Sequence, residues 1–430
     1  FVLNGKTQEV EILTLEDCLR IGIDNNLSLE GKRKEIQRSK YGVSENRSKL
    51  LPQINAIAGY SNNFDPPVSV TDGSSYGVPY NITQTLQHSA NAGLEMQMPL
   101  FNQTLYTSMS IAKVMEEISR LSYGKAREDV ILQISKMYYL GQVTAEQIML
   151  IKANITRLEE LRDITQAFFD NGMSMEVDLK RVNINLENLK VQYDNAQAMM
   201  KQQLNMLKYI MDYPAEKEIA LTPVNTDSIT TVALTGLSEN IYELQLSQSQ
   251  VQLAERQKKI ITNGYIPSLS LTGSWRYAAY TDKGYHWFHS GPSNQWFRSY
   301  GVGLTLRIPI FDGLDKTYKI KKAMIDIENK RLAWEDARKN LQTQYLNAVN
   351  DLMNNQRNFK KQKDNYLLAE DVYAVTSDRY REGIASMTEV LQDEMQMSEA
   401  QNNYISAHYN YRVTNLMLLK LTGQIESLVK

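Results

Sequence analysis

The positions of proline restrict the fold of this sequence more than any other feature. The ten prolines lie at positions 52, 66, 67, 79, 99, 214, 223, 267, 292 and 309, so none falls between Pro99 and Pro214 and none follows Pro309. Because proline breaks the interior of a helix, only these two intervals can hold very long helices. Glycine is also sparse in both intervals. The sequence therefore predicts one long helical segment in each half of the chain.

Both intervals carry an apolar stripe with helical spacing. In the second interval, aromatic residues recur every seven positions, at Phe359, Tyr366, Tyr373 and Tyr380. A stripe at heptad spacing is typical of a coiled-coil seam. Roughly 70 helical residues that rise about 1.5 Å each span on the order of 100 Å, which is more than one globular core needs. Long coiled-coil hairpins are therefore expected, and helices around an ordinary core are the weaker alternative.

The chain contains one series of landmarks twice, offset by about 210 residues. A period this long indicates a domain duplication and not a solenoid repeat. We expect a first repeat at 1–211, an equatorial linker at 212–235 and a second repeat at 236–430. The paired landmarks are Leu51-Pro52 with Ile266-Pro267, segment 93–101 with 303–311, Gly172 with Gly383, and segment 206–208 with 419–421.

Each repeat is expected to contain a helix, a strand, a loop, a strand, a long helix, a turn and a returning helix. In the first repeat, we place the strands at 53–62 and 88–98, the long helix at about 101–170 and the returning helix at about 174–208. In the second repeat, we place the strands at 267–278 and 298–309, the long helix at about 313–381 and the returning helix at about 386–421.

The expected strands alternate between apolar and polar residues, which is typical of a half-buried strand. Their length of about ten residues suits a tilted transmembrane strand. The polar faces carry Glu95, Arg276 and Arg307 among small residues, which suits the water-filled interior of a membrane barrel. A soluble sheet over a core is the alternative, but aromatic residues of the kind found at membrane interfaces crowd the strand ends and the second loop. These are Trp275, Tyr277, Tyr280, Tyr285, Trp287, Phe288, Trp296, Phe297 and Tyr300.

Four strands per chain cannot close a barrel, and unpaired backbone groups are not tolerated in hydrocarbon. Closure therefore predicts oligomerisation, and three copies would give a twelve-stranded barrel with room for a lumen. The fold class expected is mixed α and β, with four transmembrane strands per protomer and long coiled-coil hairpins. The loops between paired strands, 62–87 and 279–295, are expected to face outward.

Composition and motifs argue against several other functions. The 47 Lys and Arg residues nearly balance the 49 Asp and Glu residues, so a nucleic-acid partner is not expected. No run of about 18 apolar residues occurs, so no transmembrane helix is predicted. Cys18 is the sole cysteine and is expected to pack as a small apolar residue. With only four histidines, of which His286 and His289 lie in an aromatic loop, we expect no catalytic, cofactor or metal site.

Taken together, these residues resemble the TolC family of outer-membrane efflux proteins, or outer membrane factors, over nearly the whole chain. The resemblance rests on segment 13–19 with Asn25-Asn26, the Leu51-Pro52 strand entry, the two Pro-Leu/Ile-Phe strand exits, and the turns at Gly172 and Gly383. It implies a homotrimer with a barrel in the outer membrane and a helical tunnel in the periplasm. It also implies a passive exit duct of a tripartite efflux or secretion system, whose partners are a periplasmic adaptor, an inner-membrane pump and outer-membrane lipid.

The resemblance places a gate at the periplasmic tip, where the inner helix pair is pinched shut. In the family, rings of acids line this gate, and Glu389 matches one of them. Gln392 stands where a second ring of acids is expected, and Ala385 stands where some members carry a basic gate partner. Both positions depart from the family pattern, so the latch is expected either to use Arg381 or to be weaker. Asp393 follows Gln392 by one residue, about 100° around the helix. An ordinary solvated helix face is the competing interpretation of these charges. The expected gate residues are Asp178, Tyr380, Arg381, Glu389 and Asp393.

The same resemblance places the adaptor contacts in the two turns of the tip. The expected contact residues are Asn171, Gly172, Ser174, Gly383, Ala385 and Ser386. The main alternative function is a periplasmic coiled-coil adaptor or scaffold, which would leave the alternating strands unexplained. A general diffusion porin would need more strands per chain, and an enzyme is the weakest alternative.

Overall fold

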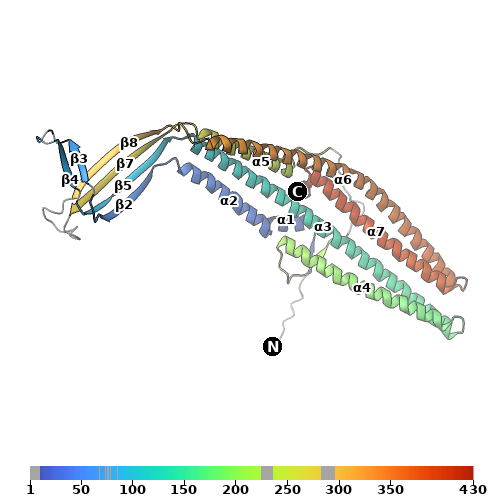
Figure 1. The fold of residues 1–430 in the computed structure, drawn as a ribbon. Helices are drawn as coiled ribbons and strands as arrows, with labels where there is room; N and C mark the ends of the chain where they lie inside the picture. Colours follow the sequence, from blue (N-terminus) through green and yellow to red (C-terminus); the bar gives the residue numbers. More distant parts are fainter. Residues whose placement is uncertain are drawn as a thin grey trace, which may run out of the picture. The chain divides into compact units, whose positions relative to one another are not determined.

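The structure is a computed structural model that describes residues 10–66, 68–72, 74, 77, 79–84, 86–223, 236–281 and 296–429 (Figure 1). Its helices are α1 Leu15–Asn25, α2 Leu27–Ser48, α3 Gln103–Asp170, α4 Glu176–Met211, α5 Tyr242–Asn263, α6 Asp315–Arg381, α7 Met387–Leu421 and the 3-10 helix η2 Ile425–Val429. Its strands are β1 Glu11–Leu13, β2 Gln53–Asn62, β3 Val68–Asp72, β4 Tyr80–Gln84, β5 His88–Phe101, β6 Ile219–Leu221, β7 Ser268–Thr281 and β8 Trp296–Arg307.

The chain forms two compact units. Unit 1 comprises Phe1–Ile36, Ser119–Gln248 and Leu332–Lys430, and unit 2 comprises Gln37–Ile118 and Ser249–Arg331. Unit 2 contains the large sheet and the helical segments that lead into and out of its strands. Unit 1 contains the two helical turns at Gly172 and Gly383, together with the short sheet near the N-terminus.

The two halves of the chain have matching elements. Helix α3 has 68 residues and α6 has 67, while α4 has 36 and α7 has 35. In each half a long strand precedes the long helix, and a turn of a few residues separates the long helix from the returning one. Because unrelated segments would not share lengths within one residue, the internal duplication predicted from the paired landmarks is confirmed.

The large sheet has the strand order β2-β5-β7-β8 and is antiparallel throughout (Figure 1). Its register places Asn55 opposite Glu95 and Glu95 opposite Ser274, so polar residues of neighbouring strands share one face. The mixed fold class, with four strands and two long helical hairpins, is thus confirmed. Among the described residues, none of the helices combines the length and apolar character required to cross a membrane.

The segment expected to be a simple loop between the first two long strands contains structure of its own. Strands β3 and β4 pair antiparallel, with Val68 opposite Gln84, and form a separate two-stranded sheet. Most of the second expected loop, including His286 and His289 and the aromatic residues between them, lies outside the described residues. So does the 224–235 part of the expected linker.

A core in unit 1 lies beneath a short parallel sheet formed by β1 and β6. Thr14 begins α1 with a capping box, in which its hydroxyl accepts from the backbone N–H of Asp17 and the Asp17 carboxylate accepts from the N–H of Thr14. Cys18 is fully buried here, and burial raises the pKa of its thiol to about 12. It therefore packs as a neutral side chain, which agrees with the sequence interpretation.

The first two heptad aromatic residues of α6 contact α7. The ring of Phe359 stacks on Tyr404 with 5.8 Å between centroids, and the ring of Tyr366 stacks on the same residue at 5.6 Å. Further along α6, Tyr373 and Tyr380 are buried. The rings of Phe359 and Tyr366 thus fill the space between α6 and α7.

Candidate functional sites in the helical turns and on the sheet

The first hairpin reverses through a Schellman turn between α3 and α4. Gly172 has a φ of 75°, a left-handed conformation that glycine adopts without a steric penalty. Its N–H donates to the carbonyl of Phe169 at 2.9 Å, and the N–H of Met173 donates to the carbonyl of Phe168 at 2.7 Å. Helix α4 then begins after Met175, whose side chain cannot cap it.

The second hairpin reverses with the same backbone geometry between α6 and α7. Gly383 also has a φ of 75°, and its N–H donates to the carbonyl of Tyr380 at 2.9 Å. Helix α7, unlike α4, begins with a capping box in which the hydroxyl of Ser386 accepts from the N–H of Glu389 at 3.3 Å. The Glu389 carboxylate accepts in return from the N–H of Ser386 at 3.4 Å. Glu389, expected as a gate acid, thus also stabilises the start of α7.

One expected gate residue, Tyr380, connects two helices near these turns, and a second, Asp178, pairs with an arginine that does so. The hydroxyl of Tyr380 donates to Oγ1 of Thr165 on α3 at 3.3 Å, and its ring lies 5.7 Å from that of Phe168. Burial raises the pKa of Tyr380, so the phenol remains a neutral donor. Asp178 pairs with Arg181 at 3.2 Å on α4, and Arg181 also donates to Oγ1 of Thr388 on α7 at 3.3 Å.

The other expected gate residues differ in their surroundings. Arg381 lies 3.3 Å from Asp378 on its own helix and 3.5 Å from Glu160 on α3. Asp393 is half-buried on α7, and no hydrogen bond or ion pair joins it to another residue in the described part of the chain. Arg381 therefore links α6 to α3, whereas Asp393 is available for contacts that a single chain does not provide.

The expected adaptor contacts are not equally accessible. Asn171, Gly172, Gly383 and Ser386 are exposed, Ser174 is half-buried, and Ala385 is buried. Sequence reasoning missed the apolar side chains that stand beside them. Met173, Met175 and Ile384 are 69%, 67% and 63% exposed, which gives both turns an apolar surface. Their signal in the sequence was apolar residues within turns that otherwise contain polar residues and glycine.

Buried polar contacts join α3 to α7, and sequence reasoning missed these as well. Asn154 donates to Gln401 at 2.7 Å, and both side chains are almost fully buried. Nearer the middle of α3, Glu146 accepts a hydrogen bond of 2.9 Å from the hydroxyl of Tyr404 and lies 3.4 Å from Nδ1 of His408. In the sequence each of these residues falls within an otherwise apolar stripe, and nothing there shows that they meet.

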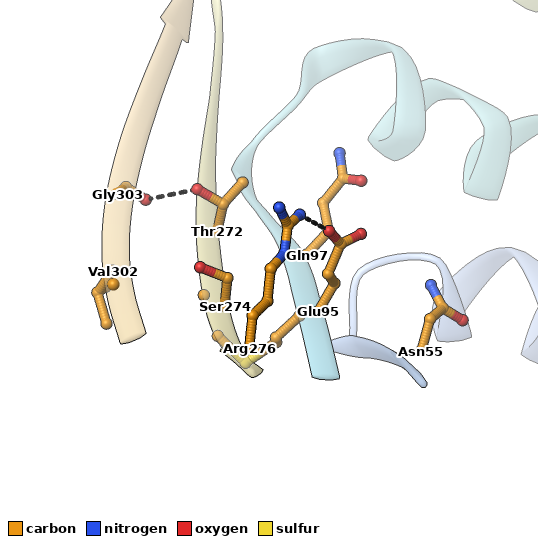
Figure 2. Close-up of a pocket in the computed structure, with 11 residues that line it drawn as sticks. Asn55, Glu95, Gln97, Thr272, Ser274, Arg276, Val302 and Gly303 are labelled. Carbon is orange, nitrogen blue, oxygen red and sulfur yellow. Dashed lines mark hydrogen bonds and ion pairs between the residues drawn. The ribbon is translucent and has the colours of Figure 1, made fainter. Parts of the chain in front are cut away.

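The polar face of the large sheet forms the second candidate site (Figure 2). Arg276 of β7 extends toward Glu95 of β5 and forms an ion pair with it. Asn55, Gln97 and Thr272 lie around the pair and line a cavity of about 500 Å³. Charged and amide groups on this face suit contact with water.

Gly93 makes the ion pair on this face sterically possible. It lies directly opposite Arg276 in the register of β5 and β7. A Cβ atom at this position would lie 2.3 Å from the backbone oxygen of Trp275 and 2.9 Å from the Cα of Arg276. Only glycine therefore allows the two strands to approach this closely at the pair.

The opposite face of the sheet is apolar and open. Along β8, Tyr300, Val302 and Leu304 are 78%, 81% and 67% exposed, and Trp275 of β7 is 46% exposed. A contiguous exposed apolar surface of this kind marks contact with a membrane or another protein. In the described part of the chain, no group of three or more His, Cys, Asp and Glu side chains could hold a metal ion.

Comparison with known proteins gives a consistent result. The family model described as "Outer membrane efflux protein" matches residues 21–211 and 233–424, which is more than half of the chain. The chain is 21% identical over 399 residues to "Outer membrane protein TolC" of Vibrio cholerae serotype O1, covering 89% of this chain and 84% of that protein. It is 23% identical over 431 residues to the "Toluene efflux pump outer membrane protein TtgC" of Pseudomonas putida, covering 95% and 82%.

Solved structures agree on the fold. A structure of CusC, whose title describes folding and transmembrane channel formation, matches with a TM-score of 0.78 at 16% identity and covers 95% of this chain and 91% of that one. The open state of the Neisseria gonorrhoeae MtrE outer membrane channel matches with a TM-score of 0.75 at 19% identity, covering 95% and 88%.

Proposed function

The chain belongs to the outer membrane efflux protein family, and on this basis we propose that it forms the outer-membrane exit channel of a tripartite efflux or secretion system. The observation that carries the proposal is the large sheet, which has one polar face with Glu95 and Arg276 and one exposed apolar face. An apolar outer face and a polar inner face are what a strand wall between hydrocarbon and a water-filled lumen requires.

The edges of this sheet support a trimer. Within the described residues, β2 pairs only with β5 and β8 pairs only with β7, so each outer edge keeps unpaired backbone groups. Hydrocarbon does not tolerate such groups, and pairing β8 of one copy with β2 of the next would satisfy them. Three copies would close a twelve-stranded barrel whose polar faces line the lumen.

The helical hairpins would extend from this barrel as a periplasmic tunnel. We assign the first repeat to 1–211, the equatorial linker to 212–235 and the second repeat to 236–430. An inner-membrane pump would supply the energy, and a periplasmic adaptor would contact the turns. The exposed Met173, Met175 and Ile384 support the turns as that contact, because apolar side chains are enriched in the buried centres of protein interfaces.

We place the gate at the same turns. Tyr380 and Arg381 tie α6 to α3, and the Asp178–Arg181 pair reaches Thr388 of α7, so these contacts would hold the hairpins together when the channel is closed. Glu389, with Asp393 one turn further along α7, would supply carboxylates near the threefold axis. Three such carboxylates close together attract cations and repel anions.

Single-particle imaging of the detergent-purified protein tests the assembly. A threefold particle with a detergent belt around the strands is expected. A monomer or dimer that remains soluble without detergent would overturn the channel and leave a coiled-coil adaptor or scaffold as the better explanation.

Single-channel recording in planar bilayers under a salt gradient tests the gate. Glu389→Gln keeps a side chain that can complete a capping box but removes the charge, so cation selectivity should fall while thermal stability stays unchanged. Glu389→Ala should lower both the cation selectivity and the thermal stability. Glu399→Gln, an exposed residue of the same helix, is the matched control and should change neither. If Glu389→Gln leaves the reversal potential unchanged, Glu389 does not line the narrow part of the channel.

A further inference from the structure

A groove of about 1000 Å³ runs between α5 and α6 within unit 2. Its walls combine lysine side chains with apolar ones. From α5 come Lys258, Lys259 and Thr262, and from α6 come Lys321, Met324 and Ile327. The groove therefore offers cationic groups beside an apolar floor.

The groove keeps a positive charge after its ion pairs are counted. The carboxylate of Glu255 is neutralised by Arg331, whose nearest guanidinium nitrogen lies 2.8 Å away. Lys258 and Lys259 form no ion pair with any residue that the structure describes. Lys321 lies 5.6 Å above the ring of Tyr318, a contact that leaves its ammonium charged. Glu328 is then the one unpaired acid of the lining, against three unpaired lysines.

The groove lies close to the end of the strands. Helix α5 ends at Asn263 and β7 begins at Ser268, while α6 begins at Asp315 shortly after β8 ends. At about 1.5 Å per residue, the three lysines lie within about 10 Å of the helix ends that join the sheet. Between them and β7 stands Tyr265, 43% exposed, with the ammonium of Lys316 5.0 Å from its ring centroid. Tyrosine and lysine at this junction are typical anchors of a membrane interface.

We propose that this groove binds an anionic phospholipid of the periplasmic leaflet, with the lipid phosphate against Lys258, Lys259 and Lys321. If the apolar face of the strands spans the membrane, the phosphates of the near leaflet lie at the level of these lysines. Met324 and Ile327 line the same groove, so the long lysine side chains can rest their methylene groups on apolar surface while the ammonium extends toward the phosphates. The inference rests on the proposed function, because it requires the sheet to lie in a membrane.

The expected size of the effect follows from the charge. Each lysine near an anionic membrane surface contributes on the order of a fivefold increase in binding, so three together contribute roughly 100-fold. The attraction weakens with distance over about 8–10 Å at physiological salt, so lysines far from the sheet should contribute nothing.

The test is native mass spectrometry of the assembled protein in detergent, with phosphatidylglycerol as the probe and phosphatidylcholine as the neutral comparison. The variant K258Q/K259Q/K321Q should bind phosphatidylglycerol about 100-fold more weakly than the unsubstituted protein. The control K360Q/K361Q/K363Q removes the same charge from a part of α6 about 40 residues further along the helix and should bind as before. Phosphatidylcholine should bind all three proteins weakly and equally.

Two results would overturn the inference. Binding of phosphatidylglycerol by the groove variant within about threefold of the unsubstituted protein would remove these lysines from the site. An equal loss in the control variant would show a general effect of net charge. Conductance of the unsubstituted protein in planar bilayers is recorded in parallel. Its absence would count against the channel itself, whereas conductance combined with unaltered lipid binding would count against the groove alone.

Discussion

Replacing Glu146 by alanine should loosen the contact between α3 and α7. The Glu146 carboxylate accepts the hydrogen bond of the Tyr404 hydroxyl at 2.9 Å and lies 3.4 Å from Nδ1 of His408. Both partners are buried, with 4% of Tyr404 and none of His408 exposed. His408 in turn accepts from Nε of Arg412 at 3.4 Å, so it bridges the acid and the guanidinium.

The magnitude follows from what the substitution leaves behind. A buried polar group without a partner costs about 1–3 kcal/mol, and removing one member of a buried charged network costs about 3–5 kcal/mol. The Glu146 side chain is 18% exposed, so water can reach part of the site and the lower part of the second range applies. About 3 kcal/mol corresponds to an opening equilibrium roughly 150-fold larger.

Hydrogen–deuterium exchange measures this local opening without requiring the whole assembly to unfold. Amides of α7 around Tyr404 should exchange about 150-fold faster in Glu146→Ala, while those of the large sheet keep their rates. Tyr404→Phe should accelerate exchange less than Glu146→Ala. The free-energy cost of the double variant should be smaller than the sum of the two single costs, because no unpaired Tyr404 hydroxyl then remains in the buried site. Glu117→Ala, an exposed acid on the same helix, serves as the control. Acceleration of less than threefold in Glu146→Ala would refute the reasoning.

Three further predictions concern the sheet, the gate and the core. Gly93→Ala should abolish assembly, measured by the yield of trimer in detergent, because its Cβ would meet the backbone of β7, whereas Gly301→Ala has its nearest side-chain atom at 3.9 Å and should assemble normally. Tyr380→Phe removes the hydrogen bond to Thr165, so it should weaken the contact between α6 and α3 by about 1 kcal/mol and raise the open probability of single channels. Burial raises the pKa of Glu128 to about 7 from an ordinary value of 4.5, so stability should fall by about 3 kcal/mol as pH rises through this window. Glu128→Gln should remove that slope, as measured by thermal unfolding at pH 5 and pH 8.

The elements that could be predicted from the sequence are those that obey one-dimensional rules. The two intervals without proline predicted α3 and α6, because a helix interior excludes proline wherever it lies in the fold. Alternation identified β5, β7 and β8, since successive side chains of a strand must point to opposite faces. Gly172 and Gly383 marked the turns because a left-handed residue is needed there.

The elements that could not be predicted depend on partners distant in sequence. Strands β1 and β6 have three residues each, and they exist because they pair with one another across about 200 residues. The 154–401 and 146–404 contacts are equally invisible, because a polar residue in an apolar stripe can face either a partner or water. Glu389 was expected only as a gate residue, and its capping box with Ser386 became apparent when the start of α7 was located.

The two copies of the duplicated hairpin share the backbone geometry of their turn but differ in how the returning helix begins. Gly172 and Gly383 share the same φ, yet α7 begins with a capping box while α4 begins after Met175 without one. A capping side chain contributes about 1 kcal/mol to the first turn of a helix. The start of α7 should therefore fray less than that of α4, although both follow the same turn. A gate acid on α7 needs a fixed position to hold charge near an axis, whereas an apolar contact surface beside Met175 gains from being able to adapt. The gate acid Glu389 thus stands at a capped helix start, whereas exposed apolar side chains stand beside both turns, with Met175 at the uncapped one.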